Sequence, residues 1–409
     1  TEGTYIATPR KLIGGDIKDI YCVDMIDSNP VVHNIKDSMK IIAKKLSKKY
    51  GSIRKAAKIL DVDENNLYYN WINKSARGNI KLDSLRKLCQ DIDFDYKKIV
   101  KEISIYNGKK HRIPITISDD LLYVAGIIAG DGDIRKSGKS ISIRLSNKEE
   151  ELHKIYTDLL KNTFCLPYDI QAGNEKRPKS TRTTSKMLGE ILLKLGIPFS
   201  PKSSNLLISN YLLHLKNEML SHYIAGLLDA DGSVYFRGDK KGSDCIDITT
   251  CSEKLARQLQ NVFLRYEIHS KLRRREKTNG KIKGQYDRWV VEIRGIEGIK
   301  KFHHNFRLRH PNKRKKLEQI IEKRKNKRTN VDIIPGVSDH LKSLLIKNGI
   351  SLKSVGWHDN LSRNGLKNIL NKVSGDGFKE LRAISESDIF WEKIVNIRPK
   401  KSEYKYVYD

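Results

Sequence analysis

Two stretches of the chain repeat the same order of hydrophobic and polar positions, about 100 residues apart. Each begins with an apolar run of helical length, at 123–132 and 223–232. Alternating apolar positions around a glycine-containing turn follow each run and predict a β-hairpin. A helical stretch, more strand-like sequence and a closing helix complete each copy. The pattern therefore predicts the order helix, hairpin, helix, hairpin, helix, twice.

The helical stretches after the first run cover 148–163 and 186–195, and those after the second cover 252–266 and 296–304. Strand-like sequence at 288–294 follows the turn pair Asn279-Gly280. Hairpins separated by helices are typical of an α+β fold with antiparallel sheets. The sequence thus predicts two pseudo-symmetric α+β halves.

The segments that flank the repeat have a different composition. Residues 35–112 are basic and mainly helical in pattern, and 52–71 has the character of a helix-turn-helix DNA-binding unit, although any small helical bundle gives similar spacing. Residues 301–330 hold twelve Lys and Arg against two Glu, which is also typical of a solvated helix face or linker. These shifts divide the chain into 1–34, 35–112, 118–215, 216–328, a helical accessory segment at 329–386, and strand-like 387–409.

Composition narrows the class of partner. The 409 residues include 79 Lys and Arg against 49 Asp and Glu, a formal net charge of +30 that indicates a polyanionic partner. Nucleic acid is the first candidate, and an anionic membrane surface would be served by similar charge. No apolar run approaches the roughly 18 residues of a membrane span, and no leader pattern is present, so we expect a cytoplasmic (intracellular) protein without a membrane partner. Five scattered cysteines without a CxxC pair indicate neither a zinc site nor a disulfide framework.

The two apolar runs combine small residues with a terminal carboxylate. Gly126 and Gly226 would let two helix backbones approach closely. Asp131 and Asp231 fall at the last helical position, where the helix macrodipole disfavours an anion, and a helix-stopping glycine follows each. If the helices pair, the two carboxylates repel each other unless a hard divalent cation such as Mg²⁺ lies between them. The alternative is two surface aspartates that end ordinary core helices.

The decapeptides at 123–132 and 223–232 resemble the paired LAGLIDADG motifs of DOD-type homing endonucleases, and the resemblance covers roughly residues 118–325. It implies two αββαββα halves with a saddle of antiparallel strands astride double-stranded DNA, in a monomer with internal pseudo-two-fold symmetry. By the family pattern, Asp131 and Asp231 bind two or three Mg²⁺ (or Mn²⁺) ions, with Gly130 and Ala230 beside them in the metal site. Such ions support phosphodiester hydrolysis on both strands.

The resemblance also implies a lysine near each scissile phosphate. Lys202 matches the family's lysine after the last helix of the first half, and Lys313 corresponds to it in the second, with Lys315 or Lys316 as alternatives. Either lysine is explained equally well as a phosphate-binding residue. The saddle strands should carry the DNA-binding side chains, most of which contact phosphate rather than base edges. These predicted residues are Arg135, Lys139, Arg144, Arg182, Arg237, Lys271, Arg273, Arg275, Lys281, Lys283, Arg288 and Arg294.

The ends of the chain resemble parts of an archaeal-type intein. Residues 3–12 are similar to the segment that leaves the first splicing block, and 387–409 to the strands that lead into the last one, so both flanks are expected to be truncated remnants of an all-β splicing domain. The chain starts with Thr and lacks a Thr-x-x-His block and a terminal His-Asn, so we do not expect it to splice alone.

The expected function is that of a site-specific, metal-dependent, intein-encoded DNA endonuclease with a long target site. Two alternatives stay open. One is a non-cleaving nucleic-acid binder on the same fold, such as an RNA maturase or a transcription regulator. The other is a protein-splicing element with a vestigial nuclease.

Overall fold

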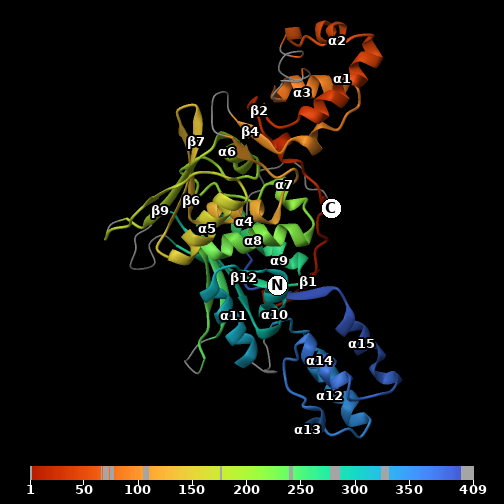
Figure 1. Cartoon of the computed structure of the whole chain (residues 1–409). Helices are drawn as coiled ribbons and strands as arrows, with labels where there is room; N and C mark the ends of the chain where they lie inside the picture. Colours follow the sequence, from red (N-terminus) through yellow and green to blue (C-terminus); the bar gives the residue numbers. More distant parts are fainter. Residues whose placement is uncertain are drawn as a thin grey trace.

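The computed structural model describes residues 2–65, 67, 73, 78–104, 110–175, 177–238, 243–276, 286–323 and 331–397. Figure 1 shows three parts: an N-terminal helical part in red and orange, a central part from yellow to teal, and a C-terminal helical part in blue. No helix within these ranges is long and apolar enough to cross a membrane.

Each half of the central part has the order αββαββα. The first half consists of α4 (Asp119–Asp131), β6 (Gly132–Ser137), β7 (Ser140–Asn147), α5 (Glu150–Asn162), β8 (Asp169–Gln171), β9 (Lys179–Thr184) and α6 (Lys186–Lys194). The second consists of α8 (Asn217–Asp231), β10 (Gly232–Tyr235), β11 (Cys245–Thr250), α9 (Glu253–Arg265), β12 (Ser270–Arg275), β13 (Arg288–Arg294) and α10 (Ile296–Asn305). The short α7 (Asn210–Leu213) precedes the second half, and α11 (Pro311–Lys323) follows it. The predicted α+β class with antiparallel sheets is confirmed.

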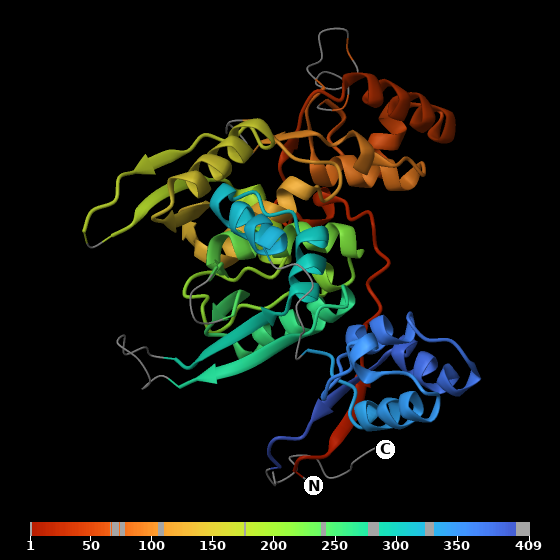
Figure 2. The ribbon, with the colours of Figure 1, turned by 90° about the horizontal axis from the view of Figure 1, so that it is seen from below.

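The two halves form matching sheets with strand orders β6-β7-β9-β8 and β10-β11-β13-β12. Alternation along β7 places Ile141, Ile143 and Leu145 in the core and Arg144 on the other face. Helix α5 covers the apolar face of the first sheet, and α9 that of the second. In Figure 2 the two hairpin arms extend to the same side of the molecule. Helices α5 and α9 therefore each leave the opposite face of their sheet uncovered.

Helices α4 and α8 lie side by side at the centre (Figure 1) and pack in direct backbone contact. A Cβ atom on Gly126 would lie 2.1 Å from the carbonyl oxygen of Tyr223, and one on Gly226 would lie 2.2 Å from that of Tyr123. Farther along, a Cβ on Gly130 would lie 2.6 Å from Cβ of Ala230. The two helices run in the same direction, and only glycine fits where they cross.

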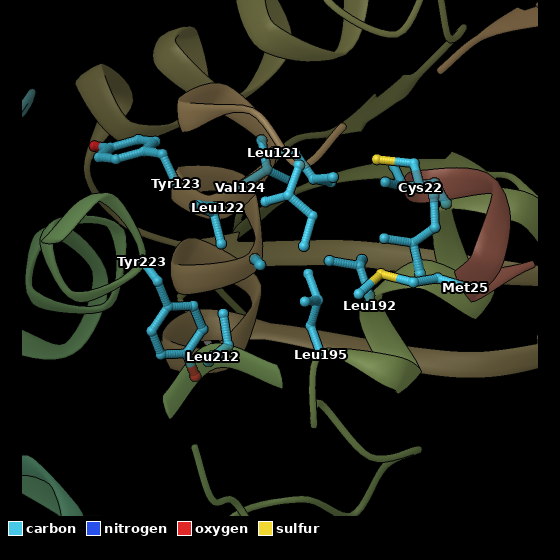
Figure 3. Close-up of a cluster of buried hydrophobic side chains, with 14 of the residues drawn as sticks. Cys22, Met25, Leu121, Leu122, Tyr123, Val124, Leu192, Leu195, Leu212 and Tyr223 are labelled. Carbon is cyan, nitrogen blue, oxygen red and sulfur yellow. The ribbon is translucent and has the colours of Figure 1, made fainter. Parts of the chain in front are cut away.

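The hydrophobic core continues from these helices into the N-terminal part. Figure 3 shows Cys22 and Met25, from the 3-10 turn Cys22–Met25, beside Leu192, with Leu121 of α4 in the same cluster. All of these side chains are buried, and they belong to one cluster that spans both halves. The C-terminal helices have a separate core.

The N-terminal part is less purely helical than its sequence pattern predicts. Helices α1 (Lys36–Tyr50), α2 (Ile53–Ile59) and α3 (Leu82–Asp91), with the 3-10 turn Tyr96–Ile99, accompany a four-stranded sheet in the order β3-β2-β4-β5. Its strands β2 (Val31–Val32), β3 (Ile80–Lys81), β4 (Glu102–Ser104) and β5 (His111–Arg112) have two or three residues, too few to show alternation. Because β2 pairs with β3 and β4, the expected boundary at residue 34 falls inside this module. Most of the expected second helix of the helix-turn-helix, up to Trp71, lies outside the described residues.

The first and last strands of the described chain pair beside the C-terminal helices. These are α12 (Val337–Lys347), α13 (Leu352–Val355), α14 (Arg363–Leu370) and α15 (Lys379–Glu386), with a 3-10 turn at Asp376–Phe378. Strand β14 (Ile389–Lys393) pairs antiparallel with β1 (Tyr5–Pro9), as the blue and red strands show in Figure 2. Asp332 joins the same region, because it accepts hydrogen bonds from Arg10 and from the buried Arg363. Residues 398–409 of the expected splicing flank lie outside the described residues.

The backbone contact between α4 and α8 predicts the effect of one added methyl group. Inside an ordinary helix, Gly→Ala stabilises by about 0.5–1 kcal/mol. At Gly126 the new Cβ has no room, so Gly126→Ala is expected to destabilise the protein by about 1–3 kcal/mol. Urea denaturation measures the change. Gly377→Ala is the control, because its Cβ would only touch Leu344 at 3.9 Å; equal stability of both variants would contradict the contact.

Candidate active site

The predicted aspartates lie together at the paired ends of the two motif helices. Asp131 is the last residue of α4 and Asp231 the last of α8. Because the helices are parallel, these ends coincide: a Cβ on Gly130 would lie 3.5 Å from the carboxyl carbon of Asp231. Asp131 is half-buried and Asp231 is exposed, so both carboxylates are open to solvent.

Glycine is required after each aspartate because a larger residue has no space there, and not because the backbone is left-handed. Gly132 and Gly232 begin strands β6 and β10 with φ of −96° and −81°, so neither adopts the left-handed form of a typical helix-ending glycine. A Cβ on Gly132 would lie 2.6 Å from Cα of Ile128, and one on Gly232 would lie 2.6 Å from the carbonyl oxygen of Leu228. Each helix therefore turns directly into its hairpin.

The carboxylate of Asp131 disfavours the charged form of Asp231. Protein atoms packed around the Asp231 carboxyl raise its pKa, although the side chain keeps access to solvent, and the adjacent Asp131 charge raises it further. Asn147, at the end of β7, donates from Nδ2 to Asp131 Oδ2 at 2.6 Å. The sequence analysis missed Asn147, and only the strand register, which places the end of β7 beside the start of β6, could have indicated it.

Lys202 lies at the end of α4. Its Nζ donates to the carbonyl oxygen of Ile128 at 2.9 Å and also to those of Ala129 and Gly130. A cation at this end of a helix is favoured by the macrodipole. Burial lowers the pKa of Lys202 to about 8, against the opposing effect of Asp231 and Asp131.

Lys313 lies at the same place on α8. Its Nζ donates to the carbonyl oxygens of Leu228 at 2.9 Å, Asp229 at 2.7 Å and Ala230 at 3.4 Å. Burial also lowers the pKa of Lys313. Lys202 and Lys313 thus bond equivalent carbonyls in the two halves, and the structure places both predicted lysines next to the aspartates.

The oxygens that face solvent here fit a shared divalent cation. The carbonyls of Gly130 and Ala230, predicted beside the metal, are bonded to the lysines instead. Among the described residues there is no cluster of three or more Asp, Glu, His or Cys that could hold a metal. Mg²⁺, however, usually binds through one or two carboxylates and keeps positions for water and phosphate oxygens. Asp131 and Asp231 suit that mode of binding.

A third carboxylate of this region lies within the second decapeptide, and the sequence analysis gave it no role. Asp229 is fully buried in α8, where it accepts a hydrogen bond from the Tyr123 hydroxyl at 2.5 Å. The equivalent residue of α4 is Ala129. Comparison of the two decapeptides alone could have singled out this difference.

The uncovered face of the first sheet carries paired charges. Asp133 accepts from Nε of Arg135 and Nε of Arg144, both at 2.8 Å. Arg182 lies opposite Arg144 in the register and 3.3 Å from Asp169. These carboxylates hold arginines on the open face, where a polyanion has access to them.

The second sheet repeats this arrangement with other residues. Glu292 is nearly buried and bonds Arg273 at 3.0 Å and Arg294 at 2.9 Å. Arg237 lies over the ring of Tyr235. The other predicted DNA-binding residues are distributed as follows: Lys271 and Arg275 on β12, Arg288 on β13, Lys139 in the turn between β6 and β7, and Lys281 and Lys283 outside the described residues.

Comparisons with known proteins agree with this architecture. Residues 218–307 match the family model described as a LAGLIDADG-like domain. The chain is 23% identical over 386 residues to glutamine–fructose-6-phosphate aminotransferase [isomerizing] of Methanocaldococcus jannaschii, covering 92% of this chain and 33% of that protein. It is also 23% identical over 369 residues to elongation factor 2 of Methanopyrus kandleri, covering 86% and 26%. The chain thus spans about a third or less of these curated relatives.

Among solved structures, the homing endonuclease I-DmoI in complex with DNA and Ca is similar to this chain, with a TM-score of 0.36 and 16% identity, covering 49% of this chain and 97% of that one. The family match, which includes most of α8 and Asp231, identifies the class of this region: residues 218–307 form a LAGLIDADG-like domain. The repeated first motif at 123–132 and the α+β halves described above agree with that class.

Proposed function

We propose that this chain is a site-specific, divalent-metal-dependent endonuclease that cuts both strands of DNA. The observation that carries the proposal is the duplicated site, in which two aspartates end adjacent helices and each helix end holds its own lysine. Because one polypeptide supplies both halves of the site, the active form is a monomer that acts on a long duplex target.

The residues divide the chemistry among them. Asp131 and Asp231 would hold the cation, and Asn147 orients the Asp131 carboxylate. A bound Mg²⁺ or Mn²⁺ supplies charge stabilisation at the phosphate oxygens and a more acidic water. Lys202 and Lys313 place an ammonium group beside each scissile phosphate, and with a pKa of about 8 Lys202 can also release a proton near neutral pH. The arginines of the uncovered sheet faces bind the backbone phosphates of the duplex.

The aspartates provide the test of hydrolysis against binding alone. Asp131→Asn and Asp231→Asn are each expected to lower the cleavage rate by at least about 100-fold. Mutation of a residue that only hydrogen-bonds a metal ligand already costs about 10- to 100-fold in metal affinity or activity. EDTA should abolish cutting in the wild type. The assay uses plasmid that carries the uninterrupted host gene, with DNA affinity measured in parallel. Unchanged affinity with lost cutting supports the proposal, whereas full cutting by both variants, or in EDTA, would leave only a nucleic-acid binder.

The N-terminal part extends the DNA-binding surface in our proposal. Helix α1 buries Met39, Ile42 and Leu46 and exposes Lys40, Lys44 and Lys48, spaced four residues apart along one face. Lysines spaced in this way follow a phosphate backbone, and each neutralised phosphate releases counterions. This interpretation keeps the predicted role of residues 35–112 without requiring a helix-turn-helix.

Salt dependence measures those contacts. The triple variant of Lys40, Lys44 and Lys48 to Gln is expected to lower the slope of log affinity against log salt by about one unit per lysine. Lys154→Gln with Lys161→Gln on α5 is the control, because α5 covers the opposite face of the first sheet. An unchanged slope in the triple variant would remove the N-terminal part from the DNA-binding surface.

We further infer that the endonuclease lies within an intein. The chain aligns over most of its own length with an aminotransferase and with a translation factor, two proteins of unrelated activity, and a segment inserted into both explains that. The pairing of β1 with β14 supports this, since it brings residues 5–9 and 389–393 side by side. Expression of the complete host polypeptide should then yield a joined host protein without this segment, detected by mass spectrometry. Recovery of only the unspliced polypeptide would contradict protein splicing and leave the nuclease proposal intact.

A further inference from the structure

Among the buried positions at which the two motif helices differ, one pairs an apolar residue with an ionisable one. Residue 129 of α4 is alanine, the equivalent residue 229 of α8 is aspartate, and both are fully buried. A buried carboxylate is costly unless hydrogen bonds compensate the loss of water. A role for Asp229 in only one half would explain why only one half carries it.

Asp229 holds the chain segment that leads to Lys313. The backbone N–H groups of Arg309 and His310 donate to its Oδ2 at 2.7 and 3.1 Å, and the Tyr123 hydroxyl donates to the same atom. Burial raises the pKa of Asp229, while these donors favour its charged form. The carboxylate therefore joins three points: α8, α4 and the chain just before α11.

Further contacts also restrict the segment from Arg309 to Lys313. Helix α11 begins at Pro311, immediately after the two residues that Asp229 holds, and Lys313 lies in its first turn. The guanidinium of Arg309 bonds Asp120 at 2.8 Å and lies 4.3 Å from the centre of the Tyr123 ring. Displacement of this segment would move the Lys313 ammonium away from the end of α8.

Lys202 is positioned by different means. The loop that carries Lys202 is held by two backbone hydrogen bonds of 2.9 Å. One runs from Ser200 N–H to the Ile134 carbonyl, and the other from Asn205 N–H to the Lys202 carbonyl. Farther along, the Ser252 hydroxyl donates to the Leu206 carbonyl at 2.7 Å. No side chain of α4 takes the part that Asp229 plays, because position 129 is alanine.

We propose that Asp229 is a positioning residue for Lys313 alone, so that the cut on one DNA strand depends on it and the cut on the other does not. This inference rests on the proposed endonuclease activity and adds a built-in difference between the two halves of its site. Loss of Asp229 should convert the protein from a double-strand cutter into an enzyme that mainly nicks one strand.

The test follows each strand separately in single-turnover cleavage of an end-labelled duplex, with the target found from wild-type plasmid cutting. Lys313→Ala identifies the strand that depends on Lys313. Asp229→Ala is expected to slow that strand about 10- to 100-fold and the other less than about threefold, because small displacements of catalytic groups cost that much. Asp229→Asn, which keeps an acceptor oxygen and the volume, should fall between Asp229→Ala and the wild type.

Two further variants separate positioning from general damage. Ser221→Ala removes another side-chain hydrogen bond of α8, from the Ser221 hydroxyl to the Glu218 carbonyl, and should slow neither strand preferentially. Asp229→Ala combined with Lys313→Ala should cut no more slowly than Lys313→Ala alone, since both act through one group. Equal slowing of both strands by Asp229→Ala and Asp229→Asn, or additive losses in the double variant, would overturn the inference. A wild type that cuts neither strand would instead refute the proposed function.

Discussion

The close approach of α4 and α8 is the constraint on which the central part depends. Two glycines, Gly126 and Gly226, each lie against a carbonyl oxygen of the opposite helix, at a separation that no side chain permits. That approach brings the helix ends together, and the two halves share one hydrophobic core. A looser crossing would separate Asp131 from Asp231, and the two sites would become independent.

The close approach also creates an electrostatic problem that the lysines reduce. Two carboxylates end helices whose macrodipoles already disfavour them. Lys202 and Lys313 bond the last carbonyls of those helices, which places positive charge within reach of both aspartates. The remaining repulsion raises the pKa of Asp231, and a divalent cation would relieve it. The repulsion that raises the pKa of Asp231 would therefore favour binding of a cation between the two carboxylates.

Much of the fold could be predicted because its signals are periodic and duplicated. The helices at 186–195 and 296–304 and the hairpins around Ile143 and Ile248 were recognisable from spacing alone. The small sheet of the N-terminal part was not, since strands such as Val31–Val32 are too short to alternate and are formed by pairing between distant segments. Asn147 and Asp229 could not be assigned for a related reason: their partners, Asp131 and the backbone at Arg309, are neighbours only after folding.

The antiparallel pairing of β1 with β14 has a mechanical consequence. Tyr5 lies opposite Lys393, so the chain enters and leaves the ladder at the same end. Tension applied at Tyr5 and Lys393 therefore breaks the paired residues of the ladder one after another from that end, instead of shearing all of them at once. A force on this segment would therefore separate the two five-residue strands from the Tyr5–Lys393 end before it reached the helices beyond them.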